Sequence, residues 1–138
     1  MLGLIALALN IIWEFSHYSL YVDLSGIPKY PHLIMASFAD TGIILCIFII
    51  ISLKNKNFDW IKNPSKFDYF FVVFLGIAIA AFLEVKNLNL GRWEYTATMP
   101  TIWGIGISPL IQLALTAAAT LALIKYTQKR YRTAANRH

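Results

Sequence analysis

Four apolar stretches, separated by short polar segments, dominate the hydrophobic pattern of the chain. They cover about 2–22, 32–53, 67–86 and 104–125. Each is close to the ~20 residues that a helix needs to cross the hydrocarbon core of a bilayer. The pattern therefore predicts an all-α, polytopic membrane protein whose four transmembrane helices form one bundle.

The connections between these stretches have the composition of membrane loops. The first holds Gly26, which favours a turn, and the second is basic and carries Trp60, a residue suited to the membrane interface. The third is long, aromatic and contains several glycines. Nothing in them marks a second domain, so residues 1–138 are predicted to form a single transmembrane domain that ends in a basic tail, 126–138.

Composition supports the membrane assignment. Of the 138 residues, 58% are hydrophobic, and the mean hydropathy of +0.59 is too high for a soluble domain of this size. The net charge of +5 does not indicate nucleic-acid binding, because the basic residues cluster where a membrane protein places them. Cys46, the single cysteine, stands in an apolar run and is predicted to be a small buried hydrophobic residue.

The distribution of lysine and arginine predicts the direction of the helices. The second connection and the C-terminal tail together hold nine of these residues, whereas the first and third connections hold three. Cytoplasmic segments of membrane proteins carry the excess of positive charge. Both termini are therefore predicted to lie in the cytoplasm, and the protein is predicted to be a multi-pass protein of the cell membrane.

Polar residues interrupt the first apolar stretch along one face. Asn10, Glu14, His17 and Tyr21 follow the i, i+4, i+7, i+11 spacing of a helix stripe. Ionisable side chains inside a membrane are costly and usually mark a functional site. Two plainer explanations stay open: Asn10 can be a hydrogen-bonding contact between helices, and His17 can serve only as the partner of Glu14.

The other stretches place polar residues at a similar depth. Asp40 and Gln112 lie about as far from the predicted outer end of their helices as Glu14 does, and Glu84 ends the third helix at the outer boundary. A local ion pair of Glu84 with Lys86 or Arg92 is an alternative explanation for that residue. The inner halves of the four stretches carry almost no such groups, so the pattern predicts one polar, acidic pocket in the outer half of the bundle.

The third connection supplies further candidates. Trp93, Tyr95 and Trp103 fit an interfacial belt, whereas Arg92, which stands between Glu84 and Gln112 in the sequence, could cover the pocket as a lid. The candidate acid–base residues are Glu14, Asp40 and His17, and the candidate ligand-binding residues are Asn10, Trp13, Tyr21, Glu84, Arg92, Trp93, Tyr95, Ser108 and Gln112.

A metal centre is a weaker possibility. Acidic residues and His17 could supply a mixed nitrogen and oxygen shell, but the Glu14-x-x-His17 spacing occurs once, whereas dimetal bundles repeat it on two helices. We therefore predict no metal site and no particular cofactor. Phosphate-binding, dinucleotide-binding and serine-hydrolase motifs are absent from the sequence.

The motifs N-x-x-W-E-x-x-H-x-x-L-Y, F-A-D, G-R-W-E-Y, M-P and G-I-G-I-S-P-L-I-Q cover nearly the whole chain. In these motifs the chain resembles a family of small bacterial four-helix membrane proteins of unassigned activity. The resemblance implies the same fold and the same polar site. The matching residues are Asn10, Trp13, Glu14, Leu20, Tyr21, Asp40, Glu84, Gly91, Trp93, Tyr95, Met99, Pro100, Gly106, Ser108, Pro109 and Gln112.

A weaker similarity connects the chain to the membrane domain of heterodimeric lycopene cyclases. It rests on Trp93 and Tyr95, followed by a glycine-containing stretch and Pro109. Residues 110–112 are Leu, Ile and Gln where that family has paired acids. The similarity therefore implies a small bundle that holds an isoprenoid or another lipid beside acidic groups, rather than the cyclase reaction itself.

Three kinds of function fit these predictions. A membrane-embedded enzyme or binder for a lipid or isoprenoid would use the acids as proton donors and acceptors. A transporter would use them to carry protons or a cation, and would need a homo-oligomer to complete a pathway. An accessory subunit would present the polar layer to a partner membrane protein. The first of these is favoured, because the inner half lacks a polar path.

Overall fold

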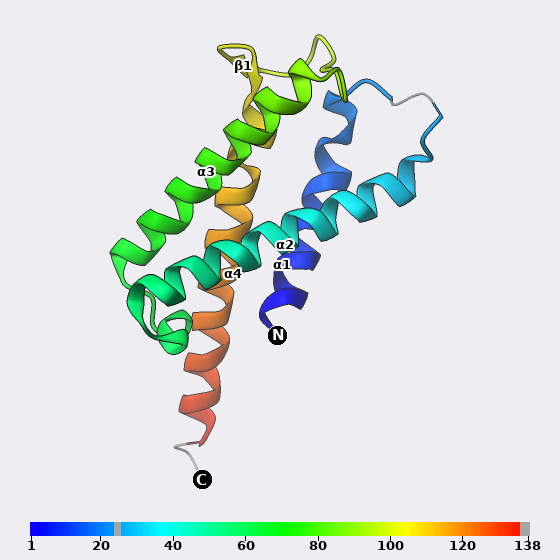
Figure 1. Cartoon of the computed structure of the whole chain (residues 1–138). Coiled ribbons are helices and arrows are strands. Elements are labelled where there is room, and N and C mark those ends of the chain that lie inside the picture. The colour runs from blue at the N-terminus through cyan, green and yellow to red at the C-terminus, as the bar shows by residue number, and fades with distance from the viewer. Residues whose placement is uncertain (24–25, 136–138) are drawn as a thin grey trace.

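Helices make up most of the structure, a computed structural model that describes residues 1–23 and 26–135, with side chains placed up to residue 130. The elements run in the order α1 (Leu2–His17), the 3₁₀ helix η1 (Tyr18–Leu20), α2 (Lys29–Asn55), η2 (Phe58–Lys62), α3 (Lys66–Asn89), β1 (Thr101–Ile102), β2 (Ile105–Gly106) and α4 (Ile107–Ala135) (Figure 1). Among the described residues, three helices are long and apolar enough to cross a membrane: α2, α3 and α4. The prediction of a helical membrane protein is confirmed to that extent.

The first helix is shorter than predicted. It ends at His17, not at residue 22, because the chain then turns through η1 into an extended segment. In that segment the Val22 N–H donates to the Glu94 carbonyl at 2.9 Å, and the Leu20 carbonyl accepts from the Thr96 N–H at 2.9 Å. These contacts with the third connection compete with a last helical turn.

The fourth helix also begins later than predicted, at Ile107. The preceding residues form a two-stranded hairpin in which Thr101 pairs with Gly106 and Ile102 with Ile105. Its two loop residues, Trp103 and Gly104, have positive φ angles of 52° and 80°, as a tight hairpin turn of the primed type requires. We call the end of the molecule that holds this hairpin the hairpin end. The opposite end, where η2 lies, is called the η2 end.

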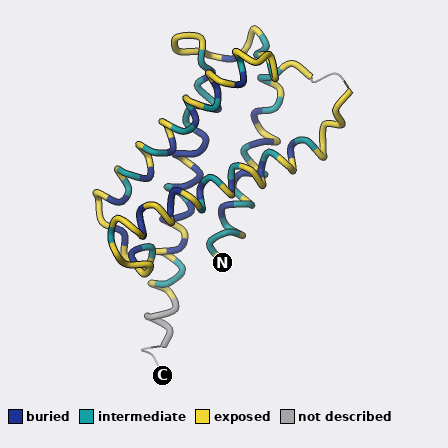
Figure 2. Tube along the Cα trace, viewed as in Figure 1, coloured by how far each residue is buried: buried dark blue, intermediate teal, exposed yellow. Residues whose placement is uncertain are grey.

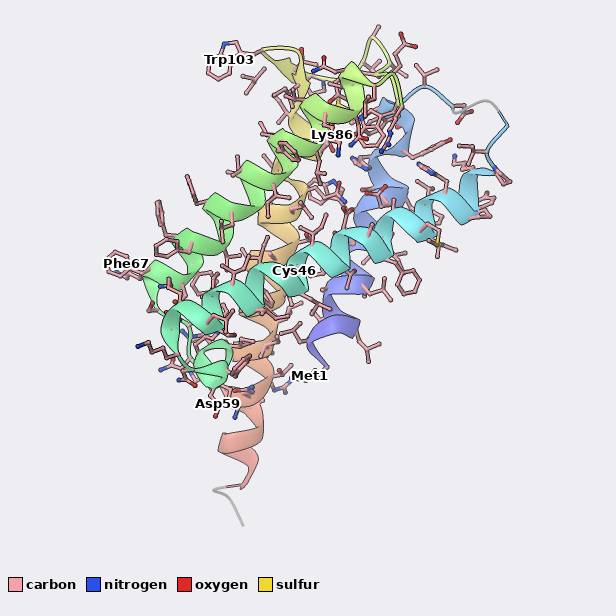
Figure 3. All side chains as sticks on the ribbon, in the orientation of Figure 1. Met1, Cys46, Asp59, Phe67, Lys86 and Trp103 are labelled. Atoms are coloured by element: carbon pink, nitrogen blue, oxygen red, sulfur yellow. The ribbon has the colours of Figure 1, made fainter. Side chains whose placement is uncertain are left out.

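The apolar side chains fall into two groups, one packed between the helices and one on the outside of the molecule. Figure 2 shows buried positions facing the neighbouring helices and exposed positions facing outward. The exposed positions include large side chains such as Phe67 (75% exposed), which points away from the molecule (Figure 3). An apolar exterior of this kind is what contact with lipid requires.

One predicted burial state is wrong, because the face of a helix on which a residue lies decides its burial, and the composition of the segment does not. Cys46, predicted to be buried, is exposed on α2. Trp60, predicted for the interface, is 5% exposed. Its ring packs on Phe48 with centroids 5.8 Å apart, and its Nε1 donates to Ser52 Oγ at 2.8 Å. At this end η2 therefore closes the core.

The helices are arranged so that space remains at the hairpin end. α1 packs against α2 and α4, and α3 packs along α4. α2 and α3 meet at η2 and then diverge towards the hairpin end (Figure 1). The divergence opens the interior in the half where the polar residues of the four helices lie, and so positions the site.

Candidate functional site

A cavity of about 520 Å³ lies between the helices in the hairpin half of the molecule. All four α-helices, η1 and the third connection contribute to its wall. Its apolar part comes mainly from α2 and α3, through side chains such as Ile43 and Leu83. The volume is in the range of small-molecule sites. The carboxyl and amide side chains that line it are Glu14, Asp40, Glu84, Asn87 and Gln112.

Gln112 joins two of the carboxyl groups. Its Nε2 donates to Glu14 Oε1 at 2.7 Å and to Asp40 Oδ2 at 2.6 Å. The three residues come from α4, α1 and α2, and Gln112 and Glu14 are buried. One amide group therefore holds two acids of different helices side by side in the wall of the cavity.

His17 continues this network along α1. Its Nε2 lies 3.5 Å from Glu14 Oε1, and its Nδ1 is 2.9 Å from Ser108 Oγ at the start of α4. The ring also contacts Tyr21 edge-on, with centroids 5.4 Å apart. The imidazole is thus fixed from both sides, and its contact with Glu14 agrees with the simpler role considered for it.

Glu84 ties the third connection to α3. Its Oε2 accepts hydrogen bonds from Trp93 Nε1 at 3.3 Å and from the Tyr95 hydroxyl, and that hydroxyl in turn accepts the Gly106 N–H at 3.0 Å. Burial, and after it the hydrogen bond to Glu84, raises the pKa of Tyr95 above its ordinary value. The phenol therefore keeps its proton and remains a donor to the carboxyl group.

Replacing Tyr95 with phenylalanine is expected to loosen the contact between the third connection and α3. The change removes the hydroxyl that links Glu84 to the Gly106 N–H, at an expected cost of about 1–3 kcal/mol in unfolding free energy. Hydrogen exchange at the Gly106 amide should become faster. Tyr30→Phe is the matched control, because Tyr30 is 65% exposed. Equal exchange in the two variants would contradict the role assigned to Tyr95.

Arg92 does not reach the cavity. It is exposed, and its Nη1 donates to Asn87 Oδ1 at 3.1 Å. Among the described residues, neither Arg92 nor Lys86 forms an ion pair with Glu84. A lid made by Arg92 is therefore not formed in this structure. Trp93 lines the cavity instead, and Tyr95 bonds to Glu84 beside it.

Asn10 lies one turn deeper on the stripe that carries Glu14. It is fully buried, and its Nδ2 donates to the Ala6 carbonyl of its own helix at 3.0 Å. Its Oδ1 has no hydrogen-bond partner among the described residues, and neither does the buried Nε1 of Trp13. Asn10 therefore makes no bond to another described helix, and it keeps an unused acceptor deep in the interior.

Some wall residues were missed by the sequence analysis. His32 on α2 and Asn87 on α3 both line the cavity, as does Tyr18 of η1. Two of them had a signal: His32 stands eight residues, or about two turns, before Asp40, and Asn87 stands three residues after Glu84. Among the described residues, no three His, Cys, Asp or Glu side chains are placed to hold a metal ion together.

No protein family, curated protein or solved structure matches this chain. The two resemblances drawn from the motifs therefore remain predictions. The function has to be inferred from the chemistry of the cavity itself.

Proposed function

We propose that the chain spans the cell membrane four times, with both termini in the cytoplasm and the hairpin end outside, as one four-helix bundle. α1 would be the fourth span, although its 16 residues make a helix only about 24 Å long. Exposed apolar side chains such as Leu4 and Ile12 support contact of its outer face with lipid. The excess of lysine and arginine near the η2 end and in the tail supports the orientation.

The cavity is proposed to bind a lipid or isoprenoid. The observation that carries this function is that one cavity is lined both by Glu14, Asp40 and Gln112 and by apolar side chains of α2 and α3. A mostly apolar pocket with a few converging polar groups is typical of a small-molecule site. Because residues of both α2 and α3 line the cavity, a lipid is proposed to enter between these two helices from the bilayer.

The acids also give the site the groups of an acid–base enzyme. Two carboxyl groups held by one amide repel each other when both are charged, which favours the presence of a shared proton. Glu14 and Asp40 are the proposed proton donor and acceptor, and His17, fixed by Ser108, orients Glu14. Such a pair can move a proton to or from a bound lipid without any other group.

Proton movement through the protein is the second candidate. The Oδ1 of Asn10, which has no partner among the described residues, extends the polar interior one turn below Glu14, and Thr116 and Thr120 continue from Gln112 along α4. The two threonine hydroxyls, however, already donate to carbonyls of their own helix, at 2.8 and 2.7 Å. They provide no open path, so lipid binding remains the function favoured here.

The first test is native mass spectrometry of the protein purified from its own membranes in a maltoside detergent. We expect a lipid-sized mass on the wild type that is lost in Ala39→Trp, because Ala39 lines the cavity on α2. Ala78→Trp is the matched control, since Ala78 is exposed on α3 and lies outside the cavity wall. Retention of the mass in Ala39→Trp would overturn the proposed site, and the same spectra report any second copy or partner protein.

A further inference from the structure

The wall of the cavity carries acids without lysine or arginine partners. Glu14, Asp40 and Glu84 all line it, and among the described residues no lysine or arginine does. Two cations at this end of the molecule are held elsewhere: Arg92 bonds to Asn87, and the Lys29 ammonium lies 4.2 Å from the centre of the Tyr18 ring. The basic side chains that do line the wall are two histidines, His17 and His32. The polar part of the ligand therefore faces an excess of negative charge.

The same region keeps acceptor atoms that can take further hydrogen bonds. Beyond the three carboxyl groups, the Oδ1 of Asn10 is fully buried, has no partner among the described residues and lies on the face of α1 that carries Glu14. Gln112 offers one amide to two acids and satisfies only one oxygen of each. A ligand that brings N–H donors would supply what this part of the protein lacks.

Aromatic rings complete the polar part of the wall. Tyr18, Tyr21 and Trp93 line the cavity, and the Tyr21 and Trp93 rings meet at 90° with centroids 6.4 Å apart. The face of an aromatic ring attracts a cation, most strongly where water is excluded. Rings and carboxyl groups together are therefore suited to a positive charge, whereas a phosphate would be repelled by the negative charge that remains on the carboxyl groups when Glu14 and Asp40 share one proton.

From this combination we propose that the ligand is an amphiphile with a primary ammonium head, which rests on the lipid-binding function proposed above. The head lies among Glu14, Asp40, Glu84 and the aromatic rings. The apolar chain leaves between α2 and α3, along the small side chains of Ala36, Ala39 and Ala80 and the apolar side chain of Leu83, all of which line the cavity. Anionic lipids are excluded from the site by the same charges.

Three probes with the same ten-carbon chain test the head group on the wild-type protein in maltoside detergent. These are decylammonium and decyl sulfonate, each added below its critical micelle concentration, and decanol, added below its solubility limit, with binding followed by native mass spectrometry. We expect decylammonium to bind at least about tenfold more tightly than decanol, and decyl sulfonate not to bind. Glu84→Gln should reduce that preference about tenfold, and Glu94→Gln should leave it unchanged, because Glu94 is exposed.

The possible results separate the ligand class from the site. Equal binding of decanol and decylammonium, lost in Ala39→Trp, would overturn the ammonium head and leave the lipid site in place. Preferential binding of decyl sulfonate would overturn the ammonium head as well. Binding of none of the probes to the wild type, with no effect of Ala39→Trp on bound lipid, would overturn both. Because the three probes are compared on the unaltered protein, the result does not depend on the folding of any variant.

Discussion

Replacing Gln112 with leucine is expected to destabilise the protein more than any other single change in the polar wall. Leucine has a similar size but no donor, so Glu14 Oε1 and Asp40 Oδ2 each lose a hydrogen bond of 2.6–2.7 Å. A buried acceptor left without its donor costs about 1–3 kcal/mol. The free energy of unfolding, measured by denaturant titration in detergent, should fall by about that amount for each carboxyl group.

Gln128→Leu is the matched control for this change. Gln128 lies on the same helix, nearer the C-terminus, and is half-buried. A double-mutant cycle that combines Gln112→Leu with Asp40→Asn adds a second measurement. The amide that Asp40→Asn introduces on α2 can donate to Glu14 in place of the Gln112 amide. The cycle should give a coupling energy of about 0.5–3 kcal/mol. Equal losses in Gln112→Leu and Gln128→Leu would show that the amide does not hold the acids together.

The position of this cluster followed from helical spacing. Glu14, Asp40 and Gln112 stand about equally far from the same end of three helices, and the structure places them in hydrogen-bond contact. Sequence spacing fixes depth along a helix because the rise per residue is constant. It does not fix rotation about the helix axis relative to a neighbour. That Gln112 would donate to both acids therefore could not be predicted.

The parts that the sequence analysis missed depend on contacts between distant segments. Helix α1 ends at His17 because the residues after it bond to Glu94 and Thr96, which belong to the third connection. Trp60 is buried because η2 folds back onto Phe48 and Ser52. Neither contact can be predicted from local composition, since an apolar residue is equally suited to lipid and to the protein core.

Arg92 shows the same limit in the site. Its position between Glu84 and the fourth helix suggested a lid over the acids, but the side chain turns to Asn87. The aromatic residues that follow it, Trp93 and Tyr95, are the ones that reach Glu84. Charge alone therefore did not identify the contact, and the backbone path of the third connection decided it.

The second large effect is expected at Gly76, where α3 and α4 come closest. A Cβ atom on Gly76 would lie 2.7 Å from both the Cα and the backbone N of Ala114, a distance that real Cβ atoms do not adopt. Ala80 continues the same face one turn later, which gives the small-residue spacing that lets membrane helices approach each other. Gly76→Ala should therefore force the helices apart and lower the free energy of unfolding by about 1–3 kcal/mol.

Gly42→Ala provides the opposite expectation with the same chemical change. Gly42 lies within α2, and a Cβ atom there meets nothing within 4 Å. Alanine at such a site removes freedom from the unfolded chain and should stabilise the protein by about 0.4–1 kcal/mol. Unfolding titrations of the two variants in one detergent should thus move in opposite directions. A shift of the same sign and size in both would mean that α3 and α4 are not packed through Gly76, and the wall that carries Gln112 and Glu84 would then need a different support.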